Sequence, residues 1–192
     1  MAEAITHIQT ITPSGSTNAM QFTSIPATYD DLLLIGTLKG QSTSHWAPND
    51  TGNNFYFGNG GSNWNTNGDY AFQQLYDQYS GGTFQGYQNN YTGAGVAAKI
   101  RAYPIPGSQN DTYTPGAWYL YVPGYAVTTN SPGRNFQMFG GCVSNSTNAL
   151  QYVQINAGMI EKSDAITDIW IYSGTGNYTT SSKMSLYGIK NT

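Results

Sequence analysis

Alternating apolar and polar positions recur along the whole chain, and they predict short β-strands and almost no helix. The period-two runs are separated by Gly, Pro, Asn, Asp and Ser, which is typical of a sandwich or a barrel. We expect about ten strands in an all-β, single-domain antiparallel β-sandwich of jelly-roll type that covers residues 1–192. The predicted strands are Ile5–Thr12, Met20–Phe22, Leu32–Leu38, Asn54–Phe57, Tyr70–Tyr76, Val96–Ala102, Ala117–Val122, Phe136–Cys142, Leu150–Met159, Thr167–Tyr172 and Lys183–Ile189.

In the stretch DDLLLIGTLKG, apolar residues occupy both the odd and the even positions. Leu32, Leu34 and Leu38 fall on one face of the predicted strand, whereas Leu33 and Ile35 begin the other. Because successive side chains of a strand point to opposite faces, such a strand is central in its sheet or covered on both sides.

The stretch AWYLYVPGYA shows the same property with aromatic residues. Its Trp118, Leu120 and Val122 share one face, and Tyr119 and Tyr121 share the other. If the first set enters the core, the two tyrosines must be covered from outside, and a neighbouring subunit would cover them.

The segments between the apolar runs predict loops and one closing hairpin. Ile169–Ile171 and Met184–Ile189 flank a polar stretch of Ser, Gly, Thr and Asn, which predicts a final hairpin with a long connection. Gln41–Trp64 and Ser80–Gly95 are rich in Asn, Gly, Ser, Thr and Tyr, so we expect long surface loops there. A helix over Tyr70–Tyr79 remains an alternative to the strand.

The composition limits the class of partner. Charged residues make up only 9% of the 192 residues, against about 25% in an ordinary soluble domain. Aromatic residues reach 14%, with sixteen tyrosines. A surface with little charge and much tyrosine favours association with other chains, including copies of itself. The net charge of −3 offers no basic stripe, so we expect no nucleic-acid partner.

The sequence also bears on the compartment. The first residues, MAEAITHIQT, lack a signal-peptide core, and no window is apolar over the roughly 18 residues that a membrane helix needs. We expect neither secretion by this route nor a membrane segment. The single cysteine, Cys142, lies in a strand-like run and allows no internal disulfide, which fits folding in a reducing cytosol.

Proton-transfer chemistry has few candidates in this chain. The two histidines, His7 and His45, lie far apart in the sequence, and no serine occupies a Gly-x-Ser-x-Gly elbow. Carboxylates occur in pairs beside predicted turns, where Asp usually accepts local hydrogen bonds. These pairs are Asp30 and Asp31, Asp69 and Asp77, and Asp164 and Asp168. We expect no catalytic residues and no enzyme activity.

The stretch NWNTNGD imitates the beginning of a calcium loop. Asn63, Asn65 and Asn67 alternate before Gly68, but they are amides, and the twelfth position is Gln74 in place of a bidentate Glu. Affinity for Ca²⁺ depends on ligand charge, so a turn is the favoured interpretation. We expect no metal and no cofactor.

Aromatic residues among the amides of the long loops allow two interpretations. Trp46, Tyr56, Trp64 and Tyr87 could form platforms for sugar rings. They could equally pack beneath their own loops or against a neighbouring subunit.

Three segments resemble small virion structural proteins of tailed bacteriophages. They are FTSIPATYDDLLLIG, WYLYVPGYA and AITDIWIYSGTGNYTTSSKMSLYGIKN. That family pairs an early F-x-S-I-P-x-T-Y-x-D-L segment with a terminal I-T-x-I…G-N-[FY]…S-L-Y-G-I segment. The matching residues are Phe22, Ser24, Ile25, Pro26, Thr28, Tyr29, Asp31, Leu32, Ile166, Thr167, Ile169, Gly176, Asn177, Tyr178, Ser185, Leu186, Tyr187, Gly188 and Ile189.

The resemblance implies a jelly-roll protein that decorates the capsid or belongs to the tail. We therefore expect a capsid decoration, or cement, protein on the virion surface, made in the host cytoplasm. Its partners would be copies of itself, as a homotrimer, and the major capsid protein. The expected contact residues are Trp46, Tyr56, Trp64, Tyr119 and Tyr121. The alternatives are a tail or fibre domain that binds host glycans and, more remotely, a carbohydrate-active enzyme.

Overall fold

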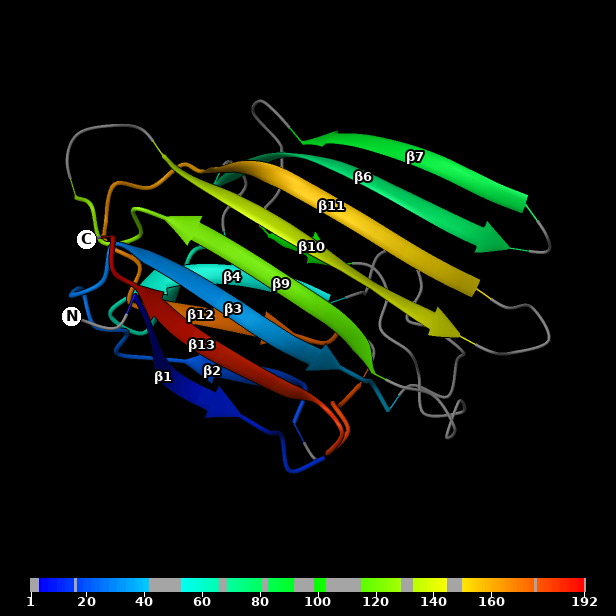
Figure 1. Cartoon of the computed structure of the whole chain (residues 1–192), viewed down its shortest axis with the longest axis horizontal. Helices are drawn as coiled ribbons and strands as arrows, with labels where there is room; N and C mark the ends of the chain where they lie inside the picture. The colour runs from blue at the N-terminus through cyan, green and yellow to red at the C-terminus, as the bar shows by residue number, and fades with distance from the viewer. Residues whose placement is uncertain are drawn as a thin grey trace.

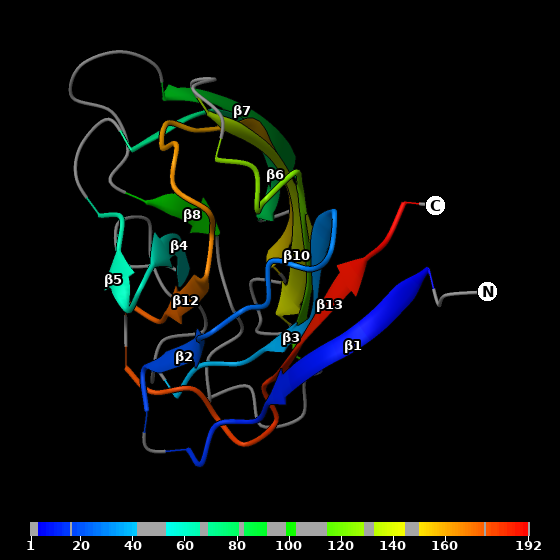
Figure 2. The ribbon, with the colours of Figure 1, turned by 90° about the vertical axis from the view of Figure 1, so that its left-hand side faces the viewer.

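Two antiparallel β-sheets face each other in the computed structural model, which describes residues 4–15, 17–41, 53–65, 69–80, 83–91, 99–102, 115–128, 133–144, 150–174 and 176–191. No helix occurs in these ranges. The eight-stranded sheet A lies in front in Figure 1, and the five-stranded sheet B lies behind it. Figure 2 shows the two layers from the side. This arrangement confirms the all-β, sandwich-like architecture.

Sheet A has the strand order β1–β13–β3–β9–β10–β11–β6–β7. The bounds are β1 (Ile5–Ile11), β13 (Lys183–Ile189), β3 (Asp31–Leu38), β9 (Gly116–Pro123), β10 (Arg134–Ser144), β11 (Leu150–Ile160), β6 (Tyr70–Ser80) and β7 (Thr83–Tyr91). Sheet B has the order β2–β12–β4–β5, and β8 also pairs with β4. Its bounds are β2 (Ala19–Phe22), β12 (Asp168–Tyr172), β4 (Asn53–Asn59), β5 (Ser62–Asn63) and β8 (Ile100–Ala102).

The core lies between the two sheets and follows the predicted alternation. On β9, Trp118, Leu120 and Val122 are buried, with exposed fractions of 2% or less, whereas Tyr119 is on the outer side. Strand β3 is paired on both edges, with β13 and β9, which confirms its prediction as a central strand. The core face expected for β9 is therefore correct.

The predicted final hairpin is wrong. Strand β12 pairs with β2 and β4 in sheet B, whereas β13 pairs with β1 and β3 in sheet A. The connecting segment crosses between the layers and buries Tyr178, whose hydroxyl donates to Asn53 Oδ1 at 2.6 Å. A polar connection of this length does not impose the register that a two-residue turn imposes, so long-range pairing decided where each strand went.

The predicted loop Ser80–Gly95 contains a strand. Strand β7 pairs with β6 along its whole length, from Ser80 opposite Thr83 to Phe72 opposite Tyr91. The sequence of β7, TFQGYQNNY, carries almost no apolar alternation, so its ladder hydrogen bonds with β6 define it. The pairing of β6 also excludes the helical alternative over Tyr70–Tyr79. Similarly, β5 and the whole of β4, which includes the predicted strand Asn54–Phe57, fall within the predicted loop Gln41–Trp64.

The two end segments that carry the family resemblance lie side by side in the fold. Phe22 on β2 pairs with Ile169 on β12, and the Ile25 amide donates to the Thr167 carbonyl at 2.9 Å. Further along, the Asp30 amide donates to the Ile189 carbonyl at 2.8 Å. The matching residues therefore join the beginning of the chain to its end in both sheets.

Gly188 shows why one position of the terminal motif needs glycine. A Cβ atom built on Gly188 would lie 2.2 Å from Cγ of Tyr29, well inside van der Waals contact. The Tyr29 ring is half-buried and packs against the core. The ring can therefore sit directly over β13 only because residue 188 has no side chain.

We predict that Gly188→Ala lowers the free energy of unfolding by about 2 kcal/mol, because the added methyl group must displace the Tyr29 ring. Chemical denaturation measures this change. In the Tyr29→Ala background the ring is absent, so the same substitution should cost at least about 1 kcal/mol less. Equal costs in the two backgrounds would show that the ring does not determine the glycine.

Candidate interaction surface on the outer face of sheet A

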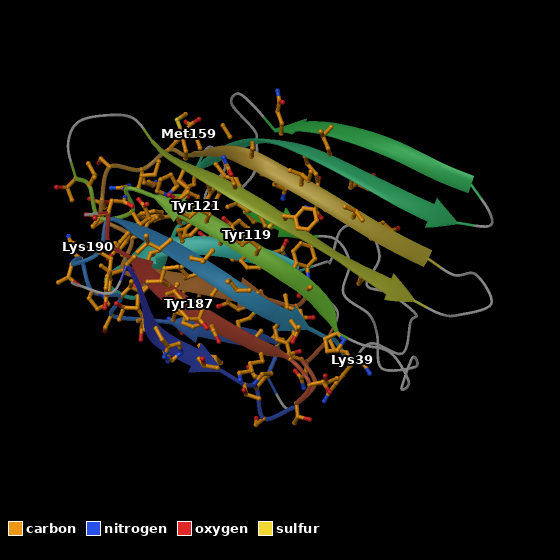
Figure 3. All side chains as sticks on the ribbon, viewed as in Figure 1. Lys39, Tyr119, Tyr121, Met159, Tyr187 and Lys190 are labelled. Atoms are coloured by element: carbon orange, nitrogen blue, oxygen red, sulfur yellow. The ribbon has the colours of Figure 1, made fainter. Side chains whose placement is uncertain are left out.

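A row of exposed apolar side chains crosses the outer face of sheet A. The strand register places Ile35 opposite Tyr119, Tyr119 opposite Phe139, Phe139 opposite Ile155, and Ile155 opposite Leu75. These five residues, called the apolar row below, come from five neighbouring strands, β3, β9, β10, β11 and β6. Their exposed fractions run from 37% for Tyr119 to 54% for Leu75. Figure 3 shows this side of the sheet, with Tyr119 near its middle.

The neighbouring rows extend the surface, and their described side chains carry no charge near its centre. On one side of the apolar row, Val153 lies two residues from Ile155 along β11 and is 50% exposed. On the other side, Leu33 lies two residues from Ile35 along β3 and pairs with Tyr187, and both are half-buried. Gln137 and Gln73 are exposed on the same face. Among the outer-face side chains of sheet A that the structure describes, the formally charged ones are Asp31 and Lys183.

The exposed apolar side chains form one cluster and are not scattered singly over the surface. Eight large apolar side chains of the described residues are exposed, and six of them are neighbours on this face: Ile35, Leu75, Tyr119, Phe139, Val153 and Ile155. The outer face of an antiparallel sheet in a lone protein is usually polar. Contiguous apolar patches of several hundred Å² mark interaction sites. The outer face of sheet A is therefore the candidate functional surface.

Tyr121 and Tyr119, both predicted contact residues, have different surroundings. The Tyr121 hydroxyl donates to Asp31 Oδ2 at 2.7 Å, while Asp31 also accepts from the Gly124 amide and from Asn191 Nδ2, each at 3.0 Å. The hydrogen bond to Asp31, with a smaller effect of burial, raises the pKa of Tyr121 to about 12. Tyr121 thus ties β9 to the start of β3, whereas Tyr119 belongs to the apolar row.

The predicted contact residues of the first long loop do not gather on this face. Tyr56 lies on β4 in sheet B, half-buried, with its ring edge-on to Tyr172 at 5.5 Å between centroids. Trp64 is 9% exposed and packs in the core, and its carbonyl accepts from the Tyr70 hydroxyl at 2.8 Å. The ring of Trp64 therefore has little surface to offer a partner. Trp46 lies outside the described residues.

The candidate proton-transfer groups have local structural partners. His7 Nε2 lies 2.8 Å from Thr10 Oγ1 on the exposed side of β1, and His45 is outside the described residues. Asp168 accepts from the Gly61 amide at 3.0 Å and from Thr167 Oγ1 at 2.7 Å. Asp69 forms an ion pair with Lys162 at 2.7 Å. Each of these carboxylates therefore stabilises a turn or a strand end.

The described residues also form no metal site, and their one thiol is buried. Within the described ranges, no three His, Cys, Asp or Glu side chains group as metal ligands would. Cys142 is buried on β10, and burial raises the pKa of its thiol to about 12. The described part of the chain holds no helix that is long and apolar enough to cross a membrane.

Arg134 is a further buried charge, and it also serves the fold. Its guanidinium donates to the carbonyls of Lys162, at 2.7 Å, of Ser163, at 2.9 Å, and of Val127. Burial lowers its pKa, and the negative charge of Asp164 opposes that shift. The side chain thereby fastens the segment after β11 to the turn after β9.

Most residues of the apolar row are absent from the sequence-based prediction. The sequence predicts Ile35 in a strand that is apolar on both faces and Tyr119 on an outward face. Phe139 carries the same signal, since Phe136 and Met138 are buried on the opposite face of β10, whereas β11 buries the polar Gln154 and Asn156 on the face opposite Ile155. What the sequence could not supply was the register that aligns these positions across strands.

Comparison with known proteins yields no relative: the chain matches no family model, and no curated protein or solved structure is significantly similar to it.

We predict that Tyr121→Phe lowers the free energy of unfolding by about 1 kcal/mol at pH 8, through loss of the hydrogen bond to Asp31. The folded-state pKa of Tyr121 is raised to about 12, above the unfolded value of 10. Its contribution is therefore complete below pH 10 and is lost as the pH rises toward 12. Denaturation of both proteins should show their difference shrinking over this range. A difference independent of pH would contradict the assignment.

Proposed function

We propose that this chain is a structural protein of a tailed-phage virion, of the capsid-decoration type, with a jelly-roll sandwich as its scaffold. The observation that carries the proposal is the uncharged apolar row on the outer face of sheet A. An exposed surface of this kind gains free energy when another protein covers it. A component of a permanent assembly uses such a surface, and the proposal includes no catalytic turnover.

The resemblance of the end segments and the apolar row support different parts of this proposal. The matching residues lie where the two ends of the chain meet, so what they share with the phage family is architecture. Phe139, Ile155 and Leu75 lie outside those segments and support an interaction. The virion location comes from the resemblance, and the binding surface comes from the fold.

The proposed mechanism is stabilisation by mass action. A protein that binds the assembled shell, but not its separated subunits, shifts the equilibrium toward the shell. The partners are copies of this chain and the major capsid protein, at the capsid surface of particles made in the host cytoplasm. The resemblance favours a homotrimer where capsomers meet.

A glycan-binding tail or fibre domain is the competing proposal. It would use loop aromatics, of which Trp64 is buried and Tyr56 packs against Tyr172. Binding on a glycan array that is lost in Tyr56→Ala would support it. The copy number in purified virions separates the two locations, because hundreds of copies indicate the shell and a few indicate the tail.

We predict that purified chain, added to particles of a phage deleted for it, rebinds and raises the temperature at which the particles release DNA. The double variant Tyr119→Ser, Phe139→Ser should rebind at least about tenfold more weakly, because it removes two aromatic side chains from the middle of the row. Co-sedimentation and quantitative gels measure the bound fraction.

The matched control is Val127→Ser, which also removes an exposed apolar side chain but lies in the turn after β9. It should rebind like the wild type. Absence of the chain from purified virions, or equal rebinding by the folded double variant, would contradict the proposal.

A further inference from the structure

We propose that the outer face of sheet A is covered by a second copy of this chain, with the two eight-stranded sheets packed face to face across a two-fold axis. The inference rests on the proposed function, because it names the first occupant of the same surface. For this face, a two-fold contact between copies takes the place of the homotrimer that the resemblance implies.

The chemistry of the face suits a copy of itself. A two-fold contact brings the same patch of both subunits together, so the patch must be complementary to itself. A charged patch would repel its copy, whereas the apolar row carries no charge. Of the charged outer-face side chains that the structure describes, Asp31 is held by hydrogen bonds from Tyr121, Gly124 and Asn191. Lys183 lies on β13, outside the five strands of the row.

The apolar centre of the face supplies a large part of the area that a stable dimer buries. An aromatic side chain buries about 150–250 Å² and an aliphatic one somewhat less, so six that are about half exposed present roughly 500 Å². A standard interface buries about 800 Å² per partner. The exposed Gln137 and Gln73 and the half-buried Tyr187 and Thr37 surround the apolar centre on the same face. An apolar centre with a polar rim is the usual anatomy of an interface.

The geometry of the row gives the contact a centre. Strands lie about 4.8 Å apart, so the row extends over about 19 Å from Ile35 to Leu75. Phe139 is its third member, with two residues on either side. A two-fold axis over the middle of the row places Phe139 opposite its own copy. Two facing sheets with interdigitated side chains pack about 10 Å apart, which an aromatic pair can fill.

A ring of copies requires more than this face provides. A heterologous contact joins two different patches of each subunit. Six of the eight large exposed apolar side chains of the described residues belong to the one face, while Ile5 lies on the edge strand β1 and Val127 lies in a turn. A single concentrated patch supports pairing rather than a ring.

The first test is the mass of the purified full-length chain in the absence of particles, by analytical ultracentrifugation over a range of concentrations. We expect twice the chain mass of 20.8 kDa at about 100 μM. Phe139→Lys places two charges opposite each other, so it should weaken association by about 100-fold or more. Val127→Lys, which adds the same charge at an exposed apolar position off the face, should remain dimeric. Circular dichroism and chemical denaturation confirm that each variant is folded.

The second test places a thiol at the proposed axis. Phe139→Cys, treated with a short bis-maleimide at pH 7.5, should yield a covalent dimer on a denaturing gel. The native Cys142 is buried and its pKa is raised to about 12, so the wild type should not cross-link. Val127→Cys should also remain uncross-linked, because the turn after β9 lies off the axis.

Three results would overturn the inference: a wild-type monomer at about 100 μM, a trimer, or a folded Phe139→Lys variant that dimerises like the wild type. The proposed function fails separately. A dimer that is absent from virions contradicts only the virion location, and a monomer that binds particles through the row contradicts only the two-fold contact.

Discussion

The constraint on which this structure depends is the pleat of a β-strand, which sends consecutive side chains to opposite faces. Strands β3, β9 and β10 of sheet A carry apolar side chains on both faces, so covering one face leaves apolar side chains exposed on the other. Sheet B covers the face that contains Trp118, Leu120 and Met138, each 2% exposed or less. Tyr119 and Phe139 then lie on the outer side, in register across neighbouring strands. The stability of the core and the apolar outer face therefore have one common cause.

The two ends of the chain close the sandwich that holds this face in place. Strand β13 lies between β1 and β3, and β12 lies between β2 and β4. Each of these two C-terminal strands is therefore paired on both edges, and at least one of its partners comes from the beginning of the chain. The close approach of Tyr29 to Gly188 and the hydrogen bonds of Asp31 bind the same region together. This junction is built from strands of the two ends of the chain. It also keeps β3 and β9 in the register that aligns Ile35 with Tyr119.

Low charge connects the composition to the proposed role. With 9% charged residues, the chain has few ionic groups to distribute over its surface. The described ones are largely used for structure: Arg134 and Asp168 are buried among backbone groups, and Asp69 pairs with Lys162. A partner that covers the outer face of sheet A therefore has few charged groups to desolvate there. A molecule of this kind suits an assembly in which that face is permanently buried.

The sequence by itself determined the all-β class, most strand positions, the central place of β3 and the buried face of β9, because period-two alternation is a local property of the chain. It also indicated that Tyr119 points outward. Only the tertiary structure decided that β12 and β13 lie in different sheets, that β7 is a strand, and that Trp64 belongs to the core. The apolar row likewise depends on pairing between segments far apart in sequence, such as Leu75 with Ile155. Register between distant strands is set by the packing of the whole molecule, and no local pattern encodes it.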